Sequence, residues 1–84
     1  MINVETRIAV IAIIVENPES VEKLNALLHE YANIIIGRMG IPCKERNLSV
    51  ISIVVDAVQD EISALSGKIG KLSGVTSKTA YSKL

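Results

Sequence analysis

The sequence predicts an α+β fold, a four-stranded antiparallel sheet with two helices on one face. Three observations lead to this prediction. β-branched runs and amphipathic stretches alternate in the order β-α-β-β-α-β. Each β-α-β half needs a right-handed crossover, which leaves the ferredoxin-like arrangement as the compact solution. That arrangement makes the first and third strands central, and these are also the two most apolar strands.

The first expected strand covers Arg7 to Val15, and no polar residue interrupts Ile8 to Val15. Such a run is typical of a strand that is covered on both faces. A helix should follow, because Asn17 can cap it and Pro18 suits the first helical position. Apolar residues then recur at helical spacing, at Val21, Leu24, Leu28 and Tyr31. The helix is expected to end near residues 32–33.

A long β-hairpin is expected over residues 34–56, where two β-branched runs flank a polar tip at Lys44 to Asn47. The first run is interrupted by Gly37, Gly40 and Pro42. Glycine and proline inside a strand pattern indicate bulges or close approach of another backbone. We therefore expect any local function to lie near this interruption.

The second helix is expected to open between Asp56 and Asp60, with capping and acidic residues at its positive end. Its interior contains Gly67 and Gly70, each of which costs about 1 kcal/mol relative to alanine. We explain them by close packing of this helix on the sheet. Val75 to Tyr81 alternates weakly and is expected to form an edge strand.

Composition indicates a single domain over residues 1–84 with an aliphatic core, since the apolar fraction is 49% but Phe and Trp are absent. Nine basic residues balance nine acidic ones, so we do not expect direct DNA binding. The single cysteine fits a reducing compartment, and the longest apolar run is too short to span a bilayer. We expect a cytoplasmic protein without a membrane partner.

The first strand is apolar on both of its faces, although the two helices should cover only one face of the sheet. A shift of register cannot hide both sets of side chains. An exposed apolar patch of this kind marks an interface. We therefore expect a homo-oligomer, a dimer or tetramer that forms through the sheet. The alternative is a monomer whose hairpin folds over its own sheet.

The sequence shows no phosphate-binding loop, nucleophile elbow or repeated Cys or His pair, so we expect a non-enzyme without cofactor or metal. His29 and Cys43 could meet as metal ligands across an interface. Zinc usually needs about three or four protein ligands, so we interpret them as a helix-surface residue and a half-buried one. Arg38 suits a carboxylate or phosphate, or else points to solvent or pairs with a neighbour.

Four stretches carry a resemblance to a known family: Arg7 to Ile11, Ile35 to Pro42, Leu48 to Asp56 and Asp60 to Gly70. They resemble a family of bacterial proteins known as iron-only hydrogenase system regulators, and Ile36 to Pro42 is the most specific part. This family is grouped with ACT-like domains and is similar to the C-terminal domain of the nickel-responsive repressor. The resemblance implies a ferredoxin-like fold, oligomerisation through the sheet and a regulatory or ligand-sensing role.

The chain departs from these relatives in two places. The His/Cys set of the nickel repressor has no counterpart beyond His29 and Cys43, so nickel binding is not carried over. ACT amino-acid sites often use an Asp and a Gly in the first strand-to-helix loop, whereas Glu16 to Ser20 contains no glycine, so the resemblance does not support amino-acid binding. We expect no helix-turn-helix or ribbon-helix-helix segment before the domain, so transcriptional regulation should require a partner or act by another route.

The resulting prediction is an ACT-like regulatory domain that binds a small-molecule effector at a subunit interface. Arg38, Met39 and Gly40 are the predicted ligand-binding residues. The alternative function is a structural protein-interaction module with no small-molecule ligand. Both functions use a homo-oligomer and allow a protein partner.

Overall fold

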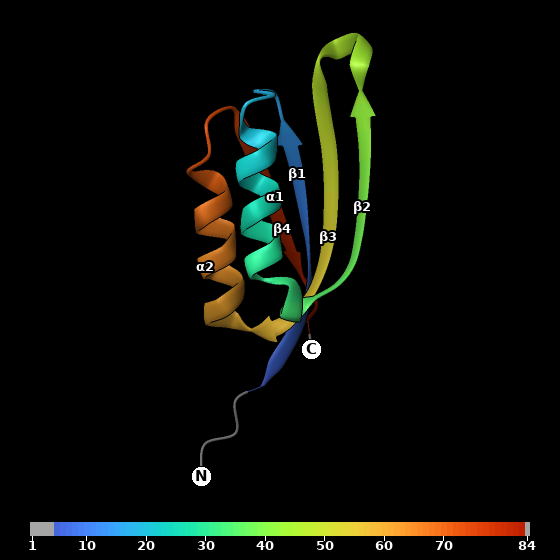
Figure 1. The fold of residues 1–84 in the computed structure, drawn as a ribbon. Helices are drawn as coiled ribbons and strands as arrows, with labels where there is room; N and C mark the ends of the chain where they lie inside the picture. Colours follow the sequence, from blue (N-terminus) through green and yellow to red (C-terminus); the bar gives the residue numbers. More distant parts are fainter. Residues whose placement is uncertain (1–4, 84) are drawn as a thin grey trace.

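The computed structural model describes residues 5–83 and confirms the ferredoxin-like α+β fold (Figure 1). Residues 1–4 and 84 of the domain expected over 1–84 lie outside the described residues. The elements of the described part are β1 (Thr6–Val15), α1 (Ser20–Glu30), β2 (Ile35–Cys43), β3 (Leu48–Val58), α2 (Gln59–Gly70) and β4 (Val75–Tyr81). A short 3₁₀ turn, Ala32–Ile34, precedes β2, and a second one, Lys44–Arg46, forms the hairpin tip between β2 and β3.

The strands form one antiparallel sheet in the order β2-β3-β1-β4. The two central strands are therefore β3 and β1, as their apolar sequences predicted. Ile11 pairs with Ile53 near the middle of these strands. Figure 1 shows α1 and α2 side by side on the same side of the sheet, and β4 lies at the sheet edge as expected.

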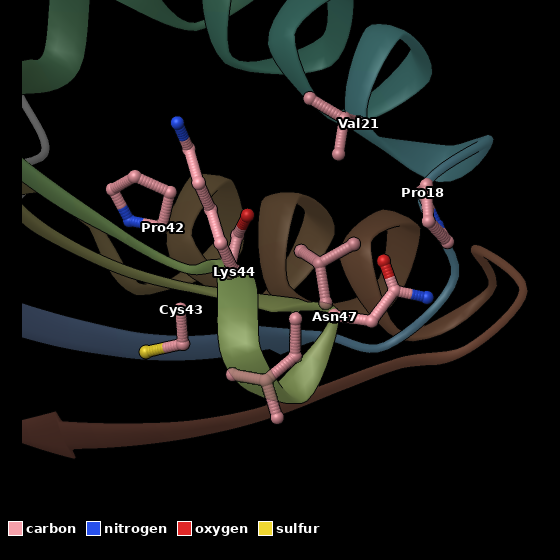
Figure 2. A pocket seen from close by; sticks show the side chains of 9 residues that line it. Pro18, Val21, Pro42, Cys43, Lys44 and Asn47 are labelled. Atoms are coloured by element: carbon pink, nitrogen blue, oxygen red, sulfur yellow. The ribbon is translucent and has the colours of Figure 1, made fainter.

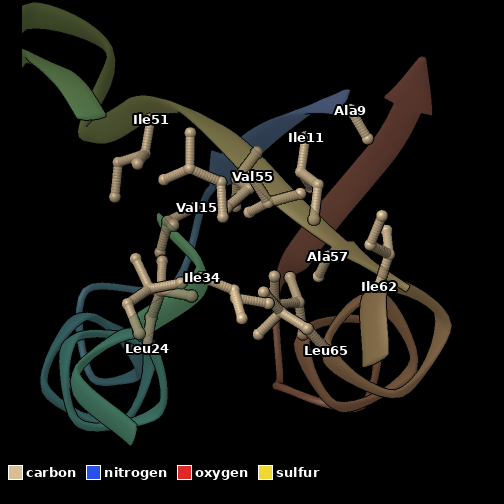
Figure 3. Close-up of a cluster of buried hydrophobic side chains, with 14 residues drawn as sticks. Ala9, Ile11, Val15, Leu24, Ile34, Ile51, Val55, Ala57, Ile62 and Leu65 are labelled. Atoms are coloured by element: carbon tan, nitrogen blue, oxygen red, sulfur yellow. The ribbon is translucent and has the colours of Figure 1, made fainter. Parts of the chain in front are cut away.

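The core lies between the sheet and the helices and is aliphatic (Figure 3). Strand residues alternate in burial, so one set of β1 side chains is 0–2% exposed, whereas their neighbours face solvent. The buried set comprises Ala9, Ile11, Ile13 and Val15 of β1, Ile51, Ile53, Val55 and Ala57 of β3, Leu24 and Leu28 of α1, Ile62, Leu65 and Ile69 of α2, and Ile34 just before β2. Burial of such side chains contributes most of the favourable free energy of folding.

Both helix starts differ from the sequence prediction. The side-chain oxygen of Asn17 accepts a hydrogen bond from the Glu19 amide at 3.1 Å, but α1 begins at Ser20. Asp56 does not cap α2, because β3 continues to Val58, which pairs with Thr6 of β1. Pairing with a neighbouring strand therefore extends β3 over residues that look like a helix start when only the local sequence is considered.

The prediction for the helical glycines was wrong. A Cβ atom added to Gly67 or Gly70 would meet no described atom within 4 Å, so neither glycine packs closely on the sheet. The close approach occurs instead at Gly74, where φ is +67° and an added Cβ would lie 2.6 Å from the Asn17 Cβ. The Gly74 carbonyl also accepts a 2.7 Å hydrogen bond from the Glu16 amide. Gly74 therefore joins the loop after β1 to the start of β4.

Replacing these glycines should have opposite effects on stability. Gly74→Ala should reduce the free energy of unfolding by about 1–3 kcal/mol, because alanine is strained at positive φ and meets Asn17. Gly67→Ala should increase the free energy of unfolding by up to about 1 kcal/mol, because Gly67 is an exposed helical residue and alanine has the higher helix propensity. Urea denaturation of both variants measures the two changes in the free energy of unfolding. An unchanged urea midpoint for Gly74→Ala would contradict the close approach of Gly74 to Asn17.

Candidate functional site

The sheet surface that faces away from the helices is largely apolar, and we call it the open face. Five large apolar side chains on it are 38–58% exposed, and three more are half-buried. The pairing register places them on one side, since Met39 lies opposite Ser52, Ile41 opposite Val50, and Val10 opposite Val54. The apolar residues of the open face are Ile8, Val10, Ala12, Ile14, Met39, Ile41, Cys43, Leu48, Val50, Val54 and Ala80.

No part of residues 5–83 covers the open face. The hairpin of β2 and β3 continues the sheet as its edge, so the alternative in which it folds over the sheet is wrong. Ser52 lies within the face, opposite Ala12 and Met39, whereas the charged residues lie toward its margins: Lys78 on the edge strand β4 pairs with Ala12, and Asp56 near the end of β3 pairs with Ile8. A mostly apolar centre with charged residues at its margin is the composition typical of a protein interface.

A second surface, the α1–β2 groove, lies on the helix side of the sheet. It consists of two adjoining hollows that share Asn25 and Arg38. One hollow extends along α1 to His29, and the other extends toward Pro42 and Ser49. Val21, Leu28, Ala32, Ile35, Gly40 and Ile51 also line these two hollows.

A further hollow continues the groove toward the hairpin tip (Figure 2). In this view Pro18 and Val21 lie on one side, and Pro42, Lys44 and Asn47 lie on the other. Val21, Pro42 and Ser49 line both this hollow and its neighbour. The seam between α1 and the hairpin is therefore hollowed from the start of α1 to near its end.

The position of Arg38 depends on a bulge in β2. Ile35 pairs with Val55, but Gly37 already pairs with Val54, so Ile36 is the extra residue. A regular strand would place Ile35, Gly37 and Met39 on the same side. The bulge reverses the alternation and places Arg38 opposite the buried Ile53, on the helix side. The bulge that the glycine pattern predicted is thus confirmed.

The three predicted ligand-binding residues do not share one surface. Arg38 and Gly40 lie in the α1–β2 groove, whereas Met39 lies between them on the open face with 58% of its surface exposed. Adjacent residues in a strand point to opposite faces, so this separation is unavoidable within one chain. Ligand binding by these residues stays a prediction.

Arg38 is exposed to solvent, is hydrogen-bonded to a neighbouring element, and forms no ion pair with a described residue. Its Nη2 donates a 2.6 Å hydrogen bond to the Asn25 side-chain oxygen across the groove. Sequence reasoning missed Asn25 and considered His29 only as a metal ligand or a helix-surface residue. His29 is four residues after Asn25, on the same side of α1. The available signal was this pair of polar residues, one turn apart, at the margin of the apolar stripe.

The single histidine and single cysteine do not meet within the chain. His29 lines the hollow near the end of α1, whereas Cys43 lines the hollow at the hairpin tip. Among residues 5–83, His, Cys, Asp and Glu side chains form no group of three that could hold a metal ion. In the same part of the chain, no helix is long and apolar enough to cross a membrane.

This architecture is that of a small ferredoxin-like α+β protein with one uncovered sheet face and one polar groove. A family model described as "TM1266-like: Iron-only hydrogenase system regulator, putative" matches residues 7–79. The chain therefore belongs to the TM1266-like family, as its resemblance predicted. The family description names a regulator and no reaction.

A solved structure supports the same relationship. The chain is similar to the uncharacterized protein TM1266 from Thermotoga maritima, with 38% sequence identity and a TM-score of 0.90. The match covers 94% of this chain and 100% of that protein. No curated protein matches the chain.

Arg7 and Arg38 should differ in their effect on stability. Arg7 donates to the Gln59 side chain at 2.8 Å and to the Ser82 carbonyl at 2.7 Å, and it stacks on Tyr81. Arg7→Gln should therefore lower the free energy of unfolding by about 1–2 kcal/mol. Arg38→Gln should change it by less than about 0.5 kcal/mol, because its bond to Asn25 is exposed. Chemical denaturation of both variants tests this difference, and a large loss for Arg38→Gln would make Arg38 a structural residue.

Proposed function

We propose that the chain is an ACT-like regulatory module of the iron-only hydrogenase system that works as a homo-oligomer. Its subunits, in this proposal, assemble through the open face. The family match supports the regulatory part of the proposal, and the exposed apolar sheet supports the assembly.

The open face is the observation that carries the proposal. Five of its large apolar side chains are exposed, and their exposed fractions are 38% for Ile8, 38% for Val10, 42% for Ile14, 58% for Met39 and 50% for Ile41. Contiguous apolar patches of this kind are rarely left in water by soluble proteins. Each Å² of apolar surface that a second subunit covers contributes about 25 cal/mol before the costs of association.

A second copy of the chain is a suitable partner for this face. Two sheets can pack face to face about 10 Å apart with their strands nearly aligned or crossed. A two-fold axis would bring the same apolar patch from each subunit together, as isologous dimers require. Further pairing of such dimers would give a tetramer.

In this proposal the regulator acts through a small-molecule effector and a protein partner. An effector shifts an assembly only if it binds one state of that assembly more tightly than another. Direct contact with DNA is not part of the proposal, because nine basic residues balance nine acidic residues. The competing function, a protein-interaction module without a ligand, would use the same open face.

A charge at the centre of the open face should separate the subunits. Val10→Asp should convert the oligomer to a folded monomer, because the carboxylate would lose its water at the interface but remain hydrated in a single subunit. Light scattering coupled to size-exclusion chromatography measures the mass, and circular dichroism checks the fold.

Ala26→Asp provides the matched control, because Ala26 is an exposed residue of α1 away from the sheet. This variant should keep the mass of the unmodified protein. A monomeric mass for the unmodified protein at micromolar concentration would reject the homo-oligomer. The same oligomeric mass for Val10→Asp would reject the open face as the interface.

A further inference from the structure

We propose that the α1–β2 groove binds a small organic carboxylate, with Arg38 as its principal contact. The inference rests on the proposed function in one respect, since it names the effector class that such a regulator would sense. It also moves the site from a boundary between subunits into a single chain. Arg38 and Gly40 keep their predicted role, and Met39 is assigned to the open face alone.

The polar groups around the centre of the groove are suited to an anion. At least one hydrogen-bond donor is present on each of four lining side chains, those of Arg38, Asn25, His29 and Ser49. None of the described residues that line the two central hollows is an aspartate or glutamate. A cationic ligand would therefore find no counter-charge in these hollows, whereas a carboxylate would find a fixed guanidinium.

Comparison with Arg7 shows that Arg38 retains unused binding capacity. Within residues 5–83, Arg7 binds two acceptors and stacks on an aromatic ring. In the same part of the chain, Arg38 has a single hydrogen-bonded partner, the neutral side chain of Asn25. A guanidinium has five N–H donors in a planar fork that matches the two oxygens of a carboxylate.

Asn25 holds the guanidinium in place and adds donors of its own. Its side-chain oxygen is occupied by Arg38 at 2.6 Å, which leaves the two N–H groups of the amide for a ligand. His29 follows one helical turn later and lines the same hollow. The arrangement thus combines a charged fork, an oriented amide and an imidazole along one side of α1.

The apolar residues that line the groove suit a ligand whose carboxylate is attached to an aliphatic body. Leu28, Ile35 and Ile51 are apolar lining residues below the polar groups. A Cβ atom added to Gly40 would meet, within 4 Å among the described atoms, only the Ile51 side chain at 3.9 Å, so there is open space above Gly40. Leu28 and Ile51 are buried and Ile35 is half-buried, so the aliphatic body of a carboxylate would contact their outer atoms and fill the space above Gly40. A bare or multiply charged phosphate would leave that space unfilled and would find one arginine for several charges.

A nuclear magnetic resonance titration of the full chain tests the proposal with three probes. Hexanoate carries the carboxylate and the aliphatic body, hexanamide is its neutral counterpart, and inorganic phosphate is an anion without an apolar body. Hexanoate should shift the backbone amide signals of Asn25, His29, Arg38 and Gly40 at lower concentrations than the other two probes. Arg38→Gln should weaken hexanoate binding by about tenfold or more, since it removes a charged hydrogen-bonding partner. The same variant should leave any hexanamide binding unchanged.

A steric pair of variants tests the place of binding. Gly40→Val should fill the groove and abolish the hexanoate shifts, because valine suits a strand and Gly40 has space above it. Gly37→Val is the matched control in the same strand, since Gly37 points to the open face, where an added Cβ would contact Val54 at 3.9 Å. This control should bind hexanoate as the unmodified protein does.

Several outcomes would overturn the proposal. They are equal shifts by hexanoate and hexanamide, equal affinity for phosphate and hexanoate, shifts confined to open-face residues, or an unchanged titration for Arg38→Gln or Gly40→Val. Light scattering on the same samples separates this failure from that of the proposed function. An intact oligomer without hexanoate binding rejects the groove alone, and a monomer that binds hexanoate rejects the assembly alone.

Discussion

The extra residue Ile36 in β2 is the local constraint that determines how the hairpin presents its side chains. Because Ile35 and Gly37 pair with neighbouring residues of β3, the alternation of β2 is reversed from Gly37 onward. Arg38 is thereby brought to α1, and Met39 to the open face. Without the bulge, the guanidinium would project from the apolar surface that we assign to assembly, and the groove would lose its cation.

The sheet as a whole is governed by an imbalance between its two faces. Two helices cover one face and bury an aliphatic core, but β1 carries apolar residues on both faces. Val10 and Ile14 are therefore exposed although they are as apolar as the buried Ile11 and Ile13. The proposed assembly surface and the proposed ligand groove lie on opposite sides of β2, because Met39 faces one and Arg38 and Gly40 line the other.

Much of the fold could be predicted because its signals are local. Hydrophobic periodicity identified the order of the elements, and the two most apolar strands are the central ones. The failures come from contacts between distant residues. Pairing of Val58 with Thr6 keeps Asp56 in a strand. The glycine at which two backbone segments approach closely is Gly74, which lies against Asn17, and not Gly67.

For the site, the glycine pattern indicated a bulge near Arg38, but only the register with β3 shows that Ile36 is the extra residue. Asn25 could not be linked to Arg38 because their hydrogen bond joins different elements.

The irregularity of β2 also bears on how large an assembly of this chain can become. β2 forms one edge of the sheet, and an edge strand is a template on which further strands can add without limit. The bulge at Ile36 and the missing amide hydrogen of Pro42 interrupt that template near both ends of β2. Growth by strand addition is thereby disfavoured, whereas pairing of two open faces closes on itself. The same residue that orients Arg38 therefore favours a finite particle over a fibre.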